Sequence, residues 1–211
     1  MTAMAGTRPM TQDERRASAR KAIIDAAVRV LADEGYRRTT FTRIQDVSGV
    51  SRGLITYHFG TKARLIEAVI TSLRDTYAEQ AIAPRAVDTL CGRDAVLAMV
   101  DSYVERLAKD PTPASVMLVI ALSSDAEEPE VVEAVRRRFA EMRADLVRWL
   151  ERGRQDGSID ENIDPAAAAV VIEGALRGIA LQFAVDPASF EVLAARHQMT
   201  SLVSRGLAPH T

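Results

Sequence analysis

The sequence predicts an all-α protein, and three observations support that class. Ala, Leu, Val, Arg and Glu dominate the composition, while aromatic residues make up only 5% of it, which favours helices over strands. Apolar residues recur three and four positions apart in one segment after another, as they do along one face of a helix. The 211 residues, 47% of them hydrophobic and 27% charged, are typical of a soluble globular chain of one or two domains.

A polar arm, residues 1–12, precedes the first predicted helix, whose apolar stripe ends at Gly35. For the start of the next helix the sequence leaves two possibilities open. Thr40 is a suitable single N-cap, whereas Thr42 together with Gln45 offers a capping box. Either start predicts a short helix.

The stretch RIQDVSGVSRGLITYHFGTKARL, residues 43–65, predicts two short helices around a tight turn. Gly49 ends the first of them, Ser51 is a good N-cap for the second, and Phe59 closes the second as a core anchor. Two short helices joined by a glycine turn fit a helix-turn-helix, in which the second helix lies in the major groove of DNA.

The charge of the chain is divided unequally along the sequence. Residues 1–65 hold 12 Lys and Arg against 6 Asp and Glu, a net charge of +6, and residues 66–211 hold 15 against 23, a net charge of −8. Basic side chains gain affinity for DNA by displacing counterions from phosphates. The basic segment therefore indicates either a polyanionic partner or an ordinary solvated surface, and charge alone leaves both open.

Several residues of the helix-turn-helix carry chemistry suited to DNA. Arg52 and Thr56 can reach base edges, Tyr57 and His58 can donate to phosphates, and Leu54 either packs in the core or faces the groove. Lys62 stands in the first turn of a helix, where the helix dipole disfavours a cation, unless a phosphate docks there. The alternative is a lysine that extends into water. The candidate DNA contacts are Thr40, Thr42, Arg43, Ser51, Arg52, Gly53, Leu54, Thr56, Tyr57, His58 and Lys62.

The rest of the chain is predicted to form further helices. A helix capped by Thr61 runs until shortly before Pro84, and an uncharged helix that begins at Pro113 is expected inside the body. The last two helices carry more apolar surface than one chain easily buries, so they either pair with a twofold copy in a four-helix bundle or pack within the monomer. Their expected ranges, with those of two earlier helices, are 92–109, 129–154, 165–185 and 187–206.

The segment also resembles a family, the tetracycline-repressor (TetR) type of bacterial transcription regulators. It departs from the family pattern at Gln45 and Ser48, where alanines are usual, and at Thr56, where most members have a phosphate-binding tyrosine. The resemblance implies about nine helices, with a DNA-binding domain over residues 13–61 and an effector-binding and dimerisation domain over residues 62–211. The matching residues are Thr39, Thr40, Ile44, Gly49, Val50, Ser51, Gly53, Ile55, His58, Phe59, Lys62 and Leu65.

The same resemblance implies how such a protein works. A homodimer formed through the last two helices binds a palindromic double-stranded operator, most often as a repressor, and a small apolar effector inside the body releases it. Each candidate for the effector pocket is also an ordinary core residue by its spacing. Arg177 either pairs with Glu173 four residues earlier or meets a ligand carboxylate. The candidates are Met99, Tyr103, Met117, Phe139, Met142, Trp149, Arg177 and Phe183.

Other classes of protein lack their usual signals in this sequence. The three histidines are widely separated, and no nucleophile elbow, phosphate-binding glycine loop or metal-ligand spacing occurs, so we expect no enzyme, no cofactor and no metal. Cys91 has no cysteine partner and suits a reducing cytoplasm as a buried thiol. The start lacks a signal peptide, and no continuous apolar run reaches membrane length, so no membrane association is expected. An architectural DNA-binding protein without an effector and, more remotely, a helical enzyme remain the alternatives.

Overall fold

The computed structural model describes residues 11–80, 87, 89–123 and 128–209. These residues form nine α-helices and their connections, with no strand among them, so the predicted fold class is confirmed. The helices are α1 (Gln12–Glu34), α2 (Phe41–Ser48), α3 (Arg52–Phe59), α4 (Lys62–Gln80), α6 (Gly92–Lys109), α7 (Thr112–Ser123), α8 (Pro129–Asp156), α9 (Pro165–Val185) and α10 (Val192–Leu207).

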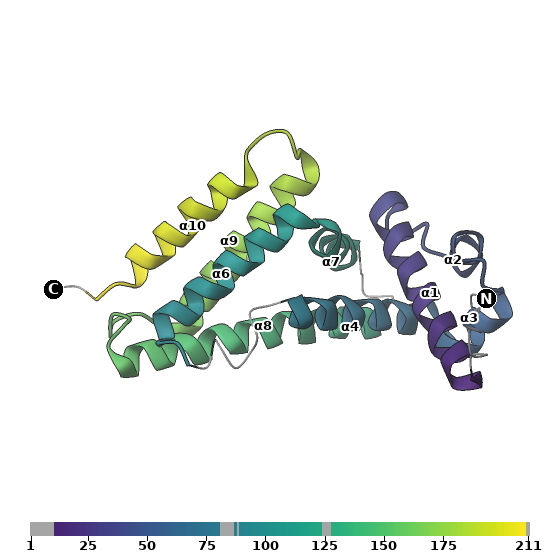
Figure 1. The fold of residues 1–211 in the computed structure, drawn as a ribbon, viewed down its shortest axis with the longest axis horizontal. Coiled ribbons are helices and arrows are strands. Elements are labelled where there is room, and N and C mark those ends of the chain that lie inside the picture. Colours follow the sequence, from purple (N-terminus) through teal and green to yellow (C-terminus); the bar gives the residue numbers. More distant parts are fainter. Residues whose placement is uncertain (1–10, 81–86, 88, 124–127, 210–211) are drawn as a thin grey trace, which may run out of the picture.

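The molecule is elongated, with α1, α2 and α3 gathered at the end opposite the C-terminus (Figure 1). Thr11 begins α1 with a capping box, since its side chain accepts from the backbone of Glu14 and the Glu14 carboxylate accepts from the backbone of Thr11. Helix α1 therefore starts at the last residue of the predicted arm. Residues 1–10 of that arm lie outside the described part of the chain.

Helices α2 and α3 are bounded by capping residues at Thr40, Gly49 and Ser51. The Thr40 hydroxyl accepts from the backbone N–H of Arg43 at 3.2 Å, which makes Thr40 the N-cap of α2 and decides between the two starts that the sequence left open. Gly49 ends α2 with φ 71°, a left-handed conformation in which a side chain would be strained. Ser51 caps α3 through the backbone N–H of Leu54.

One apolar core joins the helix-turn-helix to the body. Ile44 of α2 and Ile55 of α3 are fully buried in it, together with Leu65 at the start of α4. The same cluster continues into Val116 of α7 and Val131 of α8. The end that holds the helix-turn-helix is therefore packed on α4 and, through α1, on α7, while α4 in turn packs on α8.

The start of α6 is fixed by the end of α8. Cys91, the N-cap of α6, is half-buried and its side chain makes no capping bond, so the predicted fully buried thiol is corrected. Instead the Asp156 carboxylate accepts from the backbone N–H of Gly92 at 2.8 Å. A Cβ on Gly92 would overlap the backbone of Gly153, so the two helices approach as closely as glycine allows.

Helix α7 is less enclosed than its uncharged sequence predicts. Val116 and Ile120 are fully buried, but Leu122 near its end is 73% exposed. The helix lies against α1, α9 and, less extensively, α8. These neighbours cover only part of its circumference, since Leu122 stays exposed, and this corrects the prediction of a helix inside the body.

The last helix starts later than predicted, at Val192 rather than at Pro187. After α9 ends, the Asp186 carboxylate accepts from the backbone N–H of Ala188, and the Asp186 carbonyl accepts from the hydroxyl of Ser189. These bonds hold a turn in place of the first helical turn. The ring of Phe190 packs edge-on against Phe183, 6.1 Å between ring centres, and anchors the turn to α9.

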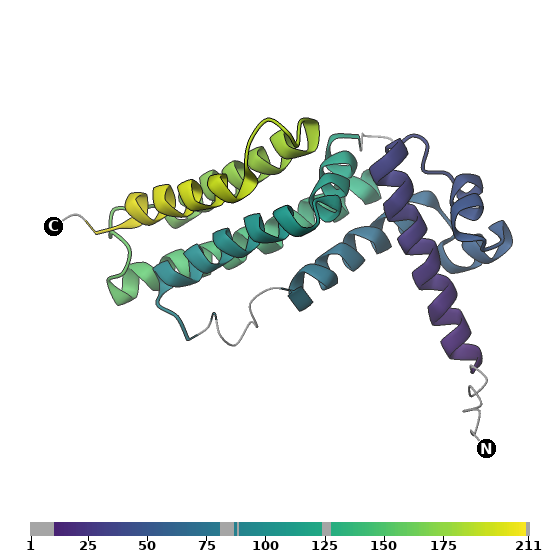
Figure 2. The same ribbon diagram turned by 45° about the horizontal axis from the view of Figure 1, so that its top comes forward.

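Helices α9 and α10 expose apolar side chains over much of their length. Figure 2 shows α10 on the outside of the body, with α9 running behind it. By length and composition alone α9 could cross a membrane, but such a helix is weak evidence, and α9 packs on α8 in this fold. The exposed apolar residues of the two helices are Val170, Val171, Leu181, Val185, Leu193 and Leu202.

Candidate DNA-binding surface and effector cavity

The outer face of α3 is exposed and polar, as a recognition helix requires. Arg52, Gly53 and Thr56 are exposed, and Tyr57 has 69% of its surface open to solvent. Leu54 is also exposed, at 37%, so it lies outside the core that Ile55 enters. The structure therefore brings these predicted contacts together on one small helix, whose reach to bases and phosphates stays a prediction.

Gln45, one of the departures from the family pattern, has a structural role. Its side-chain oxygen accepts from the backbone N–H of Arg52 at 2.9 Å. That N–H lies in the first turn of α3, where no carbonyl of the helix can reach it. Gln45 thus fixes the angle between α2 and α3 and leaves the Arg52 side chain exposed.

Three further residues that the sequence predicts to contact DNA belong to α2 or to its N-cap, beside α3. Thr40 and Thr42 are exposed, although the Thr40 hydroxyl already serves as the cap. Arg43 donates from Nε to the carboxylate of Glu34 at 2.7 Å, and its guanidinium lies 4.0 Å from Asp46. Arg43 is therefore held by protein carboxylates in this structure.

His58 is half-buried at the end of α3. Its ring meets Tyr57 edge-on at 5.5 Å and lies 6.1 Å from the ring of Phe59. The buried Nε2 atom has no hydrogen-bond partner. Packing therefore orients His58, and its donation to a phosphate stays a prediction.

Lys62 turns toward the protein and joins three parts of it. Its ammonium donates to the carbonyl of Tyr36 at 2.9 Å and lies 3.8 Å from the centre of the Tyr36 ring. The Tyr36 hydroxyl donates to the carboxylate of Glu128 at 2.6 Å, directly before α8. Burial lowers the pKa of Lys62, while the charge of Glu128 acts in the opposite direction. These contacts connect the DNA-binding end to the body, a role that the sequence did not reveal.

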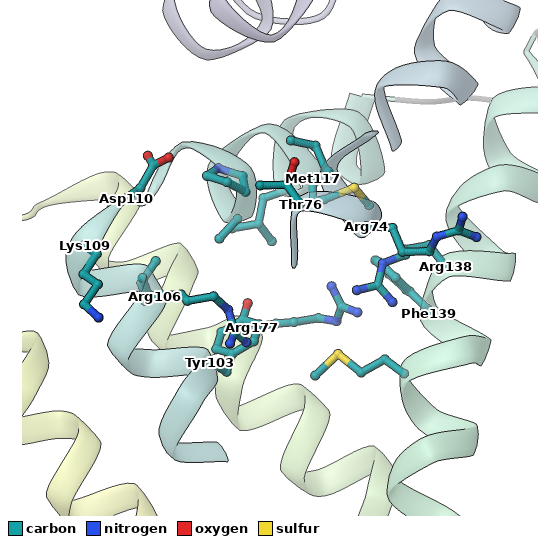
Figure 3. Close-up of a pocket in the computed structure, with 16 residues that line it drawn as sticks. Arg74, Thr76, Tyr103, Arg106, Lys109, Asp110, Met117, Arg138, Phe139 and Arg177 are labelled. Atoms are coloured by element: carbon teal, nitrogen blue, oxygen red, sulfur yellow. The ribbon is translucent and has the colours of Figure 1, made fainter. Parts of the chain in front are cut away.

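A cavity of about 440 Å³ lies in the body between α4, α6, α7, α8 and α9 (Figure 3). That volume is within the usual range for small-molecule sites. Of the eight residues predicted for an effector pocket, five line it: Tyr103, Met117, Phe139, Met142 and Arg177.

The other three predicted pocket residues do not line this cavity. Met99, Trp149 and Phe183 pack against the second core cluster of the body instead. Apart from Arg177, the sequence prediction missed the basic residues of the cavity wall. Arg106 stands three positions after Tyr103, and Arg138 four positions before Met142, so helical spacing from those apolar residues was the available signal.

Of the two roles that the sequence left open for Arg177, the structure shows the ion pair, and contact with a ligand carboxylate stays a prediction. Arg177 donates to the Glu173 carboxylate at 2.6 Å, the expected pair along α9. It also extends across the cavity, with its guanidinium carbon 3.5 Å from the centre of the Phe139 ring (Figure 3). Glu173 itself is 4% exposed and accepts a second bond, from Arg143 at 3.1 Å.

Ion pairs connect α4 to α8 along the edge of the cavity. Arg137 of α8 meets Glu67 of α4 at 2.7 Å. Arg74 of α4 lies 3.8 Å from Glu141 of α8, and Arg74 also lines the cavity. A molecule in the cavity would therefore touch one of the contacts that position α4.

Together these features define a helix-turn-helix protein whose DNA-binding end is joined to a helical body with an internal cavity. Residues 23–69 match the model for bacterial regulatory proteins of the tetR family, and residues 92–208 match the model for the C-terminal part of BetI-type transcriptional repressors. The chain belongs to the TetR family and is a DNA-binding transcriptional regulator.

Known relatives agree with that placement. BetI of Rhizobium meliloti is 32% identical over 154 residues, 72% of this chain and 73% of BetI. ArpR of Pseudomonas putida, named a probable helix-turn-helix regulator, is 41% identical over 71 residues, only 34% of either chain. The crystal structure of FadR from Bacillus subtilis, in complex with stearoyl-CoA, has a TM-score of 0.76 at 20% identity, covering 89% of this chain and 98% of FadR. This last likeness concerns the fold. The family and these relatives are regulators rather than enzymes.

Proposed function

We propose that the protein is a cytoplasmic homodimer that represses transcription by binding a palindromic operator, and that a small molecule with an apolar body releases it. The observation that carries this proposal is the exposed polar face of α3, presented beside a tight turn at the end of the molecule. A recognition helix placed in this way enters the major groove. The names of BetI and ArpR, both transcriptional regulators, support the same role.

The dimer is proposed from the exposed face of α9 and α10. Six large apolar side chains stand open on these two helices, and such a concentration of exposed apolar side chains supports an interface there. A twofold copy would cover them with the same helices of the partner. The two α3 helices would then present themselves to half-sites one DNA turn apart, which requires a separation of about 34–36 Å.

Release follows from the position of the cavity. It borders α4, which continues directly from the DNA-binding end. An effector that favours a different placement of α4 changes the separation of the recognition helices, and contacts are lost in both grooves. The complex of FadR with stearoyl-CoA shows that a protein of this fold takes a small molecule, and it supports a ligand here by analogy.

The experiment that tests DNA binding is a titration of fluorescent duplexes by anisotropy at several salt concentrations. For Arg52→Gln we expect altered base preference, with a discrimination loss of about 1–3 kcal/mol at one position. Arg154→Gln, at the far end of α8, is the matched control and should bind as the parent does. If Arg52→Gln weakened binding to all DNA sequences equally, Arg52 would only position the protein on the DNA and would not read bases.

Lys62→Ala separates two roles for the ammonium. If Lys62 also reaches a phosphate, the negative slope of log affinity against log salt concentration should be smaller in magnitude by about 1 in Lys62→Ala than in the parent. An unchanged slope removes Lys62 from the phosphate contacts and leaves its bond to the Tyr36 carbonyl as its role.

A further inference from the structure

The wall of the cavity is strongly basic, although a pocket for an uncharged apolar molecule needs no charge. Five cationic side chains line it against a single carboxylate, that of Asp110. Cations converging on a partly enclosed space raise the local concentration of anions and bind carboxylates and phosphates by charge-assisted hydrogen bonds. The five are Arg74, Arg106, Lys109, Arg138 and Arg177.

Around Arg177 the positive charge exceeds its local compensation. The buried carboxylate of Glu173 accepts from both Arg143 and Arg177, so two cations share one anion. The Nε atom of Arg177 is buried and has no hydrogen-bond partner. A buried N–H without an acceptor lowers the stability of the fold. An anionic ligand in the cavity would supply that acceptor.

Glu141 holds two of the cavity arginines at long range. Its carboxylate lies 3.8 Å from Arg74 of α4 and 4.0 Å from Arg138 of α8, beyond hydrogen-bonding distance. Arg74 is bound more closely by its neighbour Asp75, at 2.8 Å. The Arg138 side chain is only 17% exposed, so its charge acts in a less polar setting than a surface arginine.

We propose that the cavity takes a ligand with an anionic head group, a carboxylate or a phosphate, on an apolar body, and that this head group competes with Glu141 for Arg74 and Arg138. The inference rests on the proposed function, in which this cavity holds the effector. The apolar body lies against the uncharged part of the wall, formed by Leu107, Met117, Leu118, Phe139 and Met142.

The competition provides a route from ligand to DNA. When the head group binds the two arginines, Glu141 loses its partners and α4 loses one of its ionic contacts with α8. The pair between Glu67 and Arg137 remains, so α4 is loosened rather than detached. Because α4 continues from the DNA-binding end, the protein binds its operator with different affinity when α4 keeps the Glu141 contact and when it has lost it. The ligand favours the state in which the contact is lost.

The test uses four probes whose linear alkyl chains have nine or ten carbons and whose head groups differ: decanoate, decyl phosphate, decanol and decyltrimethylammonium. Calorimetric titration of the full-length protein gives each dissociation constant, and anisotropy with a duplex selected from a random pool measures release. We expect at least one anion to bind about tenfold more tightly than decanol, as a charge-assisted hydrogen bond implies, and the cation to bind most weakly. The tighter of the two anions identifies the head group.

Arg138→Gln should remove most of the anion preference, with decanol binding unchanged. Arg136→Gln, on the exposed side of α8, is the matched control and should keep the preference. Glu141→Gln removes the competing carboxylate, so the anion should bind more tightly. It should also release less DNA, because the contact that the anion would break is already absent. A variant that had only lost stability would not show both effects.

Equal binding of decanol and both anions, no binding of either anion, or a preference that survives Arg138→Gln would overturn the inference. The proposed function fails in a different way. An anion that binds selectively and leaves operator affinity unchanged contradicts effector control, whereas the anion site itself stands.

Discussion

The hydroxyl of Tyr36 offers a test of how the DNA-binding end is held to the body. Tyr36 is 5% exposed, and its hydroxyl donates to Glu128 at 2.6 Å. Tyr36→Phe removes this bond and keeps the ring beneath the Lys62 ammonium. A hydrogen bond to a charged group contributes about 1.5–3 kcal/mol, and because Glu128 is only half-buried we expect about 1.5 kcal/mol of lost stability.

For a chain of this length, each kcal/mol changes Tm by about 2–4 °C, so Tyr36→Phe should lower Tm by roughly 3–6 °C. Tyr57→Phe deletes the same atom from the exposed face of α3 and is the matched control. It should leave the free energy of unfolding within about 0.5 kcal/mol of the parent value, so Tm should hardly change, and it should weaken DNA binding instead. Scanning calorimetry and anisotropy measure the two effects. If the two variants had the same Tm, the Tyr36–Glu128 contact would not contribute to docking.

Three further predictions concern the body. Val171→Glu should convert the dimer to monomer in analytical ultracentrifugation, whereas Leu122→Glu, at an equally exposed site on α7, should not; a dimer that survives Val171→Glu would place the interface elsewhere. Gly92→Ala should destabilise by at least about 1–3 kcal/mol in urea unfolding because its Cβ overlaps the backbone of Gly153, while Gly206→Ala, with open space around it, should not destabilise. The hydrogen bond from Arg196 lowers the pKa of Asp101, so the stability it adds is present above about pH 4 and lost as the pH falls through that lowered value; Asp101→Asn should flatten this part of the acid unfolding curve, and an unchanged curve would show the pair to be irrelevant.

The helix-turn-helix could be predicted from sequence because its signals are local. The cap at Ser51 and the stop at Gly49 depend on residues within a few positions of one another and are found as expected, and Thr40 is one of the two starts that the sequence offered for α2. The start of α10 could not be predicted in the same way. Pro187 is suited to a first helical turn, but Phe190 packs on Phe183 of another helix, and such packing overrides local preference.

The cavity was predicted only in part, for a related reason. Apolar residues such as Met117 and Phe139 follow a helical period that does not distinguish a cavity wall from a filled core. The basic wall depends on which helices meet, because Arg74 and Arg138 come from α4 and α8 and share Glu141 only in the fold. The contact between Tyr36 and Glu128 joins residues 92 positions apart and has no local signal.

Selection of bound duplexes from a random pool tests the central claim most directly. The account predicts an enriched palindrome whose two half-sites are centred about one helical turn, 10–10.5 base pairs, or a multiple of it apart, because a twofold dimer presents two copies of α3. Arg52→Gln should change the preferred bases within each half-site and leave the spacing unchanged. An enriched sequence without twofold symmetry, or no enrichment above random DNA, would contradict the account.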